Sequence, residues 1–157
     1  MNNTRAAHSH PWKISDVVIF PLLLIGLAIE WLAPTALGIP RSLGITSGLL
    51  IAVGGFGLIH WSKKVLDASD QPSLPAEPTT MLVTSGPFRY SRNPNYLGAA
   101  IAVFGGAIAI DSLWLVATAT LTVLILDRWM IGPEERYLSD VFGEGYAEYR
   151  QKTRRWF

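Results

Sequence analysis

Four long apolar segments constrain the fold of this chain more than any other feature of its sequence. They run over residues 17–37, 43–61, 96–110 and 113–130. A helix needs about 20 residues to cross the hydrocarbon core of a bilayer, and three of the segments approach that length. The shorter third segment is separated from the fourth by Asp111 and Ser112, which suit a turn and a helix start. The pattern predicts an all-α integral membrane protein with about four transmembrane helices, the last two forming a hairpin.

The second apolar segment has no charged residue and is rich in glycine. Its glycines are Gly44, Gly48, Gly54, Gly55 and Gly57. Small residues let membrane helices approach each other closely, so we expect this segment to pack tightly against a neighbour. The run at residues 54–57 is not a dinucleotide-binding motif, because such a motif follows a strand rather than lying inside an apolar helix.

Length and composition exclude several classes of function. The 157 residues are enough for one domain, and a net charge of +1 leaves no general basic excess for binding nucleic acid. The absence of cysteine excludes disulfides, thiolate metal sites and a thiol nucleophile. His8 and His10 are too few, and too near the terminus, to indicate a metal site. We therefore predict no metal and no nucleic-acid partner.

Basic residues predict how the chain is oriented in a membrane. Lys63, Lys64 and the C-terminal basic cluster share a side with Arg5 and Lys13 if four helices cross, whereas Arg41 lies on the other side. Basic residues near helix ends favour the cytoplasmic face. We therefore expect a protein of the cytoplasmic membrane, with both termini and the polar loop in the cytoplasm.

The expected organisation is one domain with five parts. These are a polar tail (1–15), two transmembrane helices (16–62), a loop (63–95), a helical hairpin (96–131) and a C-terminal cytoplasmic helix and tail (133–157). Prolines at positions 72, 75, 78 and 87 exclude a continuous helix in the loop, and loops of this length are commonly functional. Pro133 suits the first turn of the last helix, which should continue to about Arg150.

The loop leads into a polar segment that is the strongest functional signal in the chain. Residues 82–98 read LVTSGPFRYSRNPNYLG, which places turn formers, arginines and aromatics between apolar segments. A polar island in a membrane protein usually marks the functional site. Each part also has a structural interpretation: Gly86-Pro87 as a turn, Arg92 as a lipid phosphate contact and Asn93 as a helix cap.

This segment, an apolar hairpin and the segment PEERYLSDVFGEGYAEYRQKTRRWF at residues 133–157 occur in a characteristic order. Together they resemble the integral-membrane methyltransferases related to isoprenylcysteine carboxyl methyltransferase and phospholipid methyltransferase, over residues 81–156. The resemblance implies S-adenosylmethionine-dependent methyl transfer to a lipophilic or membrane-accessible acceptor. Prenylated protein C-termini, amine lipids, quinone-like lipids and small thiols all remain open as acceptors, and the oligomeric state is also open.

The same resemblance implies a set of site residues. The implied cofactor contacts are Met81, Leu82, Val83, Phe88, Asn93, Pro94, Asn95, Tyr96, Glu134 and Glu135. The implied catalytic residues are Arg92, Asn93 and Tyr96, and Arg128 is the candidate for substrate binding. Carboxylates, backbone groups and aromatic rings suit a sulfonium donor that carries an amino acid, a ribose and an adenine.

The chain departs from the family pattern at two places. Asn93 stands where many relatives have histidine, and 153–156 reads TRRW where relatives often have Val-Pro-Arg-Trp. Asparagine forms hydrogen bonds but does not titrate near neutrality, which puts an imidazole base at this position in doubt. Methyl transfer gains from alignment and desolvation, so it does not require such a base.

Two other functions fit parts of the pattern. A membrane reductase of the sterol or steroid kind, which uses NADPH, shares an Arg-x-Pro-x-Tyr box, but that group tends to continue with Gly-Glu where this chain has Gly98-Ala99. A noncatalytic membrane scaffold would explain Asn93. Glu30 is a further candidate for function, because an acidic group within an apolar segment is costly unless it is paired or interfacial.

Overall fold

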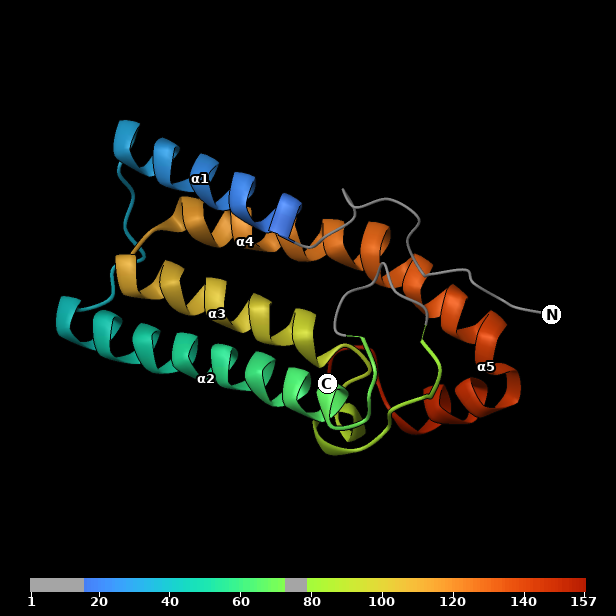
Figure 1. Ribbon diagram of the computed structural model, residues 1–157. Coiled ribbons are helices and arrows are strands. Elements are labelled where there is room, and N and C mark those ends of the chain that lie inside the picture. The colour runs from blue at the N-terminus through green and yellow to red at the C-terminus, as the bar shows by residue number, and fades with distance from the viewer. Residues whose placement is uncertain (1–15, 73–78) are drawn as a thin grey trace.

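Figure 1 shows the computed structural model of the chain, which describes residues 16–72 and 79–157. The helices are α1 (Asp16–Leu32), α2 (Arg41–Asp67), α3 (Pro94–Ile110), α4 (Leu113–Ile125) and α5 (Gly132–Lys152), with a 3-10 turn at Gly86–Arg89 and a π-helical segment at Leu126–Ile131. These two ranges contain no strand, which confirms the predicted all-α class for the part of the chain described. The expected polar tail, with His8 and His10, and two of the loop prolines, Pro75 and Pro78, lie outside the described residues.

The four apolar helices form a bundle in the order α1, α4, α3, α2. Helix α1 packs on α4, α4 contacts α3, and α3 packs along the length of α2 (Figure 1). Helix α5 continues from α4 past the end of the bundle and then turns back beside the polar loop. The loop, the beginning of α3 and the C-terminus therefore meet at one end of the bundle.

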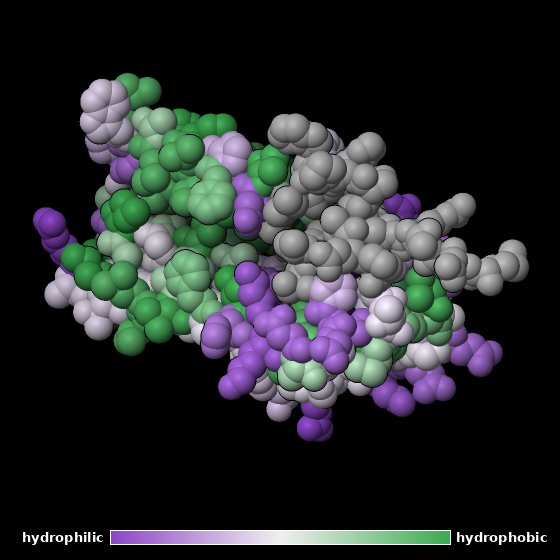
Figure 2. All heavy atoms as spheres, viewed as in Figure 1, coloured by the Kyte–Doolittle hydropathy of each residue, from purple (hydrophilic) through white to green (hydrophobic). Residues whose placement is uncertain are grey.

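The helix bundle has an apolar outer surface. Figure 2 shows hydrophobic side chains over the helices and hydrophilic ones gathered at the end where the polar loop lies. Side chains that are more than half exposed include Leu24, Leu50, Val53 and Leu124. Among the described residues, α2 and the joined α4 and α5 are long and apolar enough to cross a membrane, and α3 is a shorter apolar helix. These features indicate a helical membrane protein, because water-soluble monomers rarely expose apolar surface so extensively.

The close approach of α2 and α3 depends on glycine. A Cβ atom at Gly55 would lie 2.5 Å from both the carbonyl oxygen of Gly98 and the amide nitrogen of Ala102. The α2 glycines that face α3 are Gly44, Gly48 and Gly55. Gly54 and Gly57 face open space, so the predicted tight packing is confirmed for three of the five glycines.

Two helix boundaries differ from the sequence prediction. Helix α1 ends at Leu32 rather than at residue 37, because Pro34 disfavours helical geometry in the residue before it. Helix α2 continues to Asp67, so Lys63 and Lys64 are helical rather than part of the loop. No proline or glycine follows Trp61 to stop the helix earlier, and the chain first turns at Asp70, where φ is 50°.

The turn between α3 and α4 is confirmed in detail. Asp111 adopts the left-handed conformation with φ 62°, and Ser112 caps α4 by accepting a hydrogen bond from the Leu115 amide at 3.1 Å. The side chain of Ser112 also donates to Glu30 at 2.5 Å. This contact joins the end of the hairpin to the end of α1.

The last helix follows α4 without a loop. Pro133 lies in the first turn of α5 as predicted, but α5 continues directly from the π-helical segment. Proline has no N–H to donate to the preceding turn, and a wider π turn is a common accommodation for such a defect. The predicted end near Arg150 agrees with α5, which ends at Lys152, but Gly143, with φ 51° and ψ −121°, breaks the helix and turns the chain back toward the loop.

Candidate functional site

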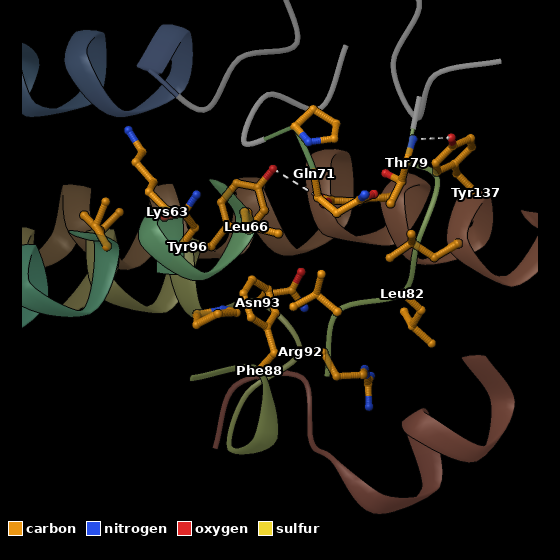
Figure 3. Close-up of a pocket in the computed structure, with 18 of the residues that line it drawn as sticks. Lys63, Leu66, Gln71, Thr79, Leu82, Phe88, Arg92, Asn93, Tyr96 and Tyr137 are labelled. Atoms are coloured by element: carbon orange, nitrogen blue, oxygen red, sulfur yellow. Dashed lines mark hydrogen bonds between the residues drawn. The ribbon is translucent and has the colours of Figure 1, made fainter. Parts of the chain in front are cut away.

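A cavity of about 250 Å³ lies where the polar loop, the beginning of α3 and the first turns of α5 meet. The family-implied residues that line it are Met81, Leu82, Val83, Phe88, Arg92, Asn93, Pro94, Asn95, Tyr96 and Glu134. Figure 3 shows Leu82, Phe88 and Tyr96 placed around this cavity by different parts of the chain. The structure thus brings together all of the implied residues except Glu135 and Arg128.

One wall of the cavity is a stretch of loop held by side chains that are distant in sequence. The buried Gln71 accepts hydrogen bonds from the Thr80 and Met81 amides at 2.9 and 3.0 Å, and Gln71 Nε2 donates to the Thr80 hydroxyl at 2.9 Å. The Tyr137 hydroxyl, from α5, accepts from the Thr79 amide at 3.1 Å (Figure 3). These bonds position the backbone of residues 79–83 at the cavity.

A second wall is formed by the 3-10 turn. Gly86 adopts φ 58°, which glycine tolerates without strain, and Pro87 is buried. The hydroxyl of Tyr149, from α5, donates to the carbonyl of Phe88 at 2.7 Å. The backbone of Phe88 is therefore held from α5 while its ring lines the cavity.

Asn93 occupies the N-cap position of α3 but does not cap the helix with its side chain. Its backbone N–H donates to the Ser91 hydroxyl at 3.1 Å, and its side-chain amide makes a long hydrogen bond of 3.5 Å to the carbonyl of Arg155. The capping interpretation of Asn93 is therefore wrong for its side chain. The residue is buried and lines the cavity.

Glu134 and Tyr96 connect α5 to α3 at the cavity. The Tyr96 hydroxyl donates to Glu134 Oε2 at 3.2 Å. Burial raises the pKa of Glu134 to about 7, the hydrogen bond from Tyr96 acts in the opposite direction, and the charge on Glu135 raises the pKa further. Glu134 is thus an acid close to its titration point near neutral pH.

Glu135 lies in a different environment from its neighbour. Its carboxylate is 2.8 Å from Arg92 Nη2 and 2.5 Å from Arg155 Nη2, and its side chain is only 7% exposed. Burial acts to raise the pKa of Glu135, but the hydrogen bonds from Arg155 and Arg92 hold it below its usual range. The Glu135 carboxylate forms ion pairs with Arg92 and Arg155 beside the cavity and does not line the cavity.

The two arginines of the predicted site also differ. Arg92 lines the cavity, but its guanidinium is bound by Glu135 and by the carbonyl of Thr153 at 2.5 Å. Arg128 lies in the π-helical segment, is exposed and is not part of the cavity wall. The neighbouring Asp127 accepts hydrogen bonds from Arg155 instead.

Twelve residues that line the cavity were not singled out from the sequence as site residues, and six of them are polar or charged. The six are Asp16 of α1, Lys63 and Gln71 near the end of α2, Thr79 of the loop, and Tyr137 and Tyr149 of α5. Ile59, Lys63 and Leu66 all line the cavity at helical spacing, a signal that a longer second helix would have revealed. Gln71 has no such signal, because its role depends on a loop that returns to it.

Over the described residues, the fold is that of an all-helical membrane protein with a cavity of mixed polar and apolar lining at one end of its bundle. The sequence profile of the phospholipid methyltransferase family matches residues 43–145, which include nearly all of α2, all of α3 and α4, and most of the cavity. The chain belongs to this family.

Three individual relatives are similar to parts of the chain, and one of them is a methyltransferase. The chain is 28% identical to the protein-S-isoprenylcysteine O-methyltransferase of Schizosaccharomyces pombe over 144 residues, covering 90% of this chain and 56% of that protein. It is 33% identical to the cobalt-zinc-cadmium resistance protein CzcN of Cupriavidus metallidurans over 76 residues, covering 48% and 35%. It is 44% identical to an uncharacterized protein of Haemophilus influenzae over 34 residues, covering 22% and 54%. The chain therefore spans about half, or less, of the length of these curated relatives.

Proposed function

We propose that this protein is an S-adenosylmethionine-dependent membrane methyltransferase that acts on a lipophilic or membrane-accessible acceptor. The observation that carries the proposal is the single cavity into which the loop, α3 and α5 bring the family-implied residues. Membership of the family and the similarity to an isoprenylcysteine methyltransferase support the same reaction class.

The polar groups of the cavity fit this cofactor. Glu134 offers a carboxylate to a cation or a hydroxyl group, and Phe88 offers an aromatic face. The side-chain oxygen of Asn95, another lining residue, is buried without a hydrogen-bond partner among the described residues, so the site has an acceptor to spare. Bound S-adenosylmethionine supplies an electrophilic methyl group on a sulfonium centre.

The side of the cavity formed by α1, α2 and α3 is largely apolar, with Asp16 and Lys63 as its charged residues. Ile19 of α1, Ile59 and Leu66 of α2 and Ala99 of α3 line it, at the end of the bundle where the apolar surface gives way to the polar loop. Such a lining suits an acceptor that enters from the bilayer and presents a polar head to the polar wall. An acceptor seated against these side chains would displace water from the reacting groups and be aligned with the donor.

Glu134 and Tyr96 provide the proton chemistry of the proposed site. A carboxylate with a pKa of about 7 takes up a proton from an amine or thiol acceptor near neutral pH. A carboxylate acceptor has no such proton to lose and needs only alignment. Asn93 forms hydrogen bonds but holds no proton for exchange, so the proposed reaction does not pass through it as a base.

Calorimetric titration of the detergent-purified protein tests the proposal. We expect S-adenosylmethionine and its demethylated product to bind, and NADPH, titrated in parallel, not to bind. Binding of NADPH alone would identify a reductase, and binding of none of the three by a folded sample would identify a scaffold. Transfer of a labelled methyl group to prenylcysteine, amine-lipid, quinone and thiol acceptors then identifies the substrate.

The proposal includes four membrane crossings with the cavity on the cytoplasmic side. Lys63 and Lys64 at the cavity end of α2, and Arg41 at its other end, support this orientation. The chain has no cysteine, so a single introduced cysteine reports its own location. In intact cells, Gly38→Cys should react with an impermeant maleimide, whereas Arg89→Cys should react only after permeabilisation; the reverse pattern would invert the topology.

A further inference from the structure

We infer that residues 153–156 form a C-terminal clasp that positions Arg92 and Asn93 at the cavity, and that Arg155 is the positioning residue that anchors it. The catalytic consequence of this inference rests on the proposed methyltransferase function. The clasp itself rests on hydrogen bonds that do not depend on any ligand.

Three successive carbonyls of the clasp bind the residues that lead into α3. The chain leaves α5 at Lys152 and becomes extended at Thr153. The carbonyl of Thr153 accepts from Arg92 Nη1 at 2.5 Å, and the carbonyl of Arg154 accepts from the Arg92 amide at 2.9 Å. The carbonyl of Arg155 accepts from the Ser91 hydroxyl at 2.9 Å. The backbone of the C-terminus thus binds Ser91 and Arg92 through one amide and two side chains.

The side chain of Arg155 fixes the clasp to the rest of the protein. Its guanidinium bridges Glu135, at 2.5 Å, and Asp127, at 3.0 Å. Trp156 adds a hydrogen bond from Nε1 to Asp127 at 3.0 Å and packs against the buried cluster that contains Tyr96. Such charge-assisted, forked bonds are geometrically specific, and a lysine at position 155 cannot reproduce them.

The clasp also determines how Asn93 is presented. The side-chain amide nitrogen of Asn93 is directed to the Arg155 carbonyl, so its oxygen remains available as an acceptor at the cavity. Arg92, held between Glu135 and Thr153, precedes it directly. Loss of the Arg155 anchor should therefore shift the cavity wall without removing any group that lines it.

Hydrogen exchange and cofactor binding test this inference together. The variants are Arg155→Ala, the conservative Arg155→Lys and the control Arg154→Ala, whose side chain is exposed. Exchange is measured by mass spectrometry, without cofactor, on peptides covering residues 88–96. We expect faster exchange there in both Arg155 variants, and an affinity for S-adenosylmethionine weakened by about 10- to 100-fold in the alanine variant and less in the lysine variant. Arg154→Ala should match the wild type in both measurements.

A double-mutant cycle separates positioning from general stability. If the clasp acts through Asn93, combining Arg155→Lys with Asn93→Ala should weaken binding by less than the product of the two separate effects. If Arg155→Ala does not fold, hydrogen exchange and affinity for S-adenosylmethionine are both measured on Arg155→Lys.

Each other result is decisive. Wild-type exchange in a folded Arg155 variant would overturn the clasp, and faster exchange with unchanged affinity would overturn its positioning role, as would effects that simply multiply in the cycle. Failure of the wild-type protein itself to bind S-adenosylmethionine would overturn the proposed function, while the exchange measurement would still decide whether the clasp exists.

Discussion

The polar groups at the two ends of the helix bundle differ in how fully they are hydrogen-bonded. At the end away from the cavity, the Glu30 carboxylate accepts hydrogen bonds from the Thr35 amide at 2.8 Å, the Thr35 hydroxyl at 2.7 Å and the Ser112 hydroxyl at 2.5 Å. Asp111 accepts from the Leu37 amide at 3.0 Å. These carboxylates join the two connections of the bundle, so Glu30 has a structural explanation.

At the cavity end, hydrogen-bonding capacity is left over. Glu134 receives a hydrogen bond from Tyr96, its partner among the described residues, and the side-chain oxygen of Asn95 has none there. Unsatisfied polar groups are costly away from water. The difference teaches that acidic groups whose hydrogen bonds are all made within the protein stabilise this fold. Polar groups that keep free hydrogen-bonding positions around a cavity are suited to a ligand. Glu135 belongs to the first kind and Glu134 to the second, although they are neighbours in the chain.

Removal of Glu135 should have the largest effect on stability. Glu135→Ala leaves Arg92 and Arg155 without their shared carboxylate. Breaking a buried ion pair from one side costs about 3 to 5 kcal/mol, and we expect the lower end because the Arg155 side chain is 33% exposed. Chemical unfolding in detergent measures the loss. A Glu134→Ala protein as unstable as Glu135→Ala would remove the distinction between the two glutamates.

Neutralising Glu134 should affect binding rather than folding. Glu134→Gln keeps the size and hydrogen-bonding capacity of the side chain but removes its charge. Hydrogen bonds to charged groups contribute about 1.5 to 3 kcal/mol, so S-adenosylmethionine should bind roughly 10- to 100-fold more weakly in calorimetry. The free energy of unfolding should stay level or rise, because a buried charge is removed. Unchanged affinity would place Glu134 outside the cofactor site.

Glu30 should show the reverse behaviour. Glu30→Gln weakens three hydrogen bonds at the saturated end, so we expect a lower free energy of unfolding than in the wild type, with a smaller loss than in Glu135→Ala. Affinity for the cofactor should match the wild type, because Glu30 is not part of the cavity wall. A weakened affinity at wild-type stability would contradict the structural assignment of this end.

The pH dependence should follow the raised pKa of Glu134. Its folded-state pKa of about 7 lies above the ordinary value of 4.5, so the folded state binds the extra proton between these values. The contribution of Glu134 to stability is therefore greatest at low pH and falls as pH rises from about 4.5 to 7. Affinity for the cationic cofactor should rise over the upper part of that window, by up to about tenfold per pH unit.

Two controls test the origin of this pH effect. The demethylated product, which lacks the sulfonium charge, should show a weaker dependence on pH. In Glu134→Gln, the affinities for S-adenosylmethionine and for the demethylated product should depend on pH to the same extent. An equal pH dependence in the variant would assign the effect to another group.

Arg128 should give the smallest effect. Its side chain is exposed and away from the cavity, so Arg128→Ala should change stability by less than about 0.5 kcal/mol and leave cofactor affinity within twofold. A fall in acceptor turnover with unchanged cofactor binding would support the substrate contact that the family resemblance implies. A fall in cofactor affinity would show that the π-helical segment is more closely coupled to the cavity than the contacts of Arg128 indicate.

Local signals in the sequence were sufficient for much of the fold. Apolar length predicted the helical class, and Asp111 with Ser112 predicted the hairpin turn because the left-handed residue and the cap are both local features. The family motifs identified ten of the residues that line the cavity, and the roles of these residues are proposed above. The break at Gly143 was not predicted, because a glycine inside a helical pattern can adopt either helical or non-helical dihedral angles.

The sequence by itself determined which segments are helical, which helix surfaces can pack closely and which family the motifs resemble, because these depend on residues near one another in the chain. Only the tertiary structure decided that Glu135 is consumed by Arg92 and Arg155 while Glu134 faces the cavity, and that the C-terminus holds the approach to α3. Two adjacent glutamates have the same chemistry and lie in the same turn. Their roles diverge because the environment of each carboxylate, and hence its pKa, is set by partners that lie more than 15 residues away in sequence and meet it only in the folded protein.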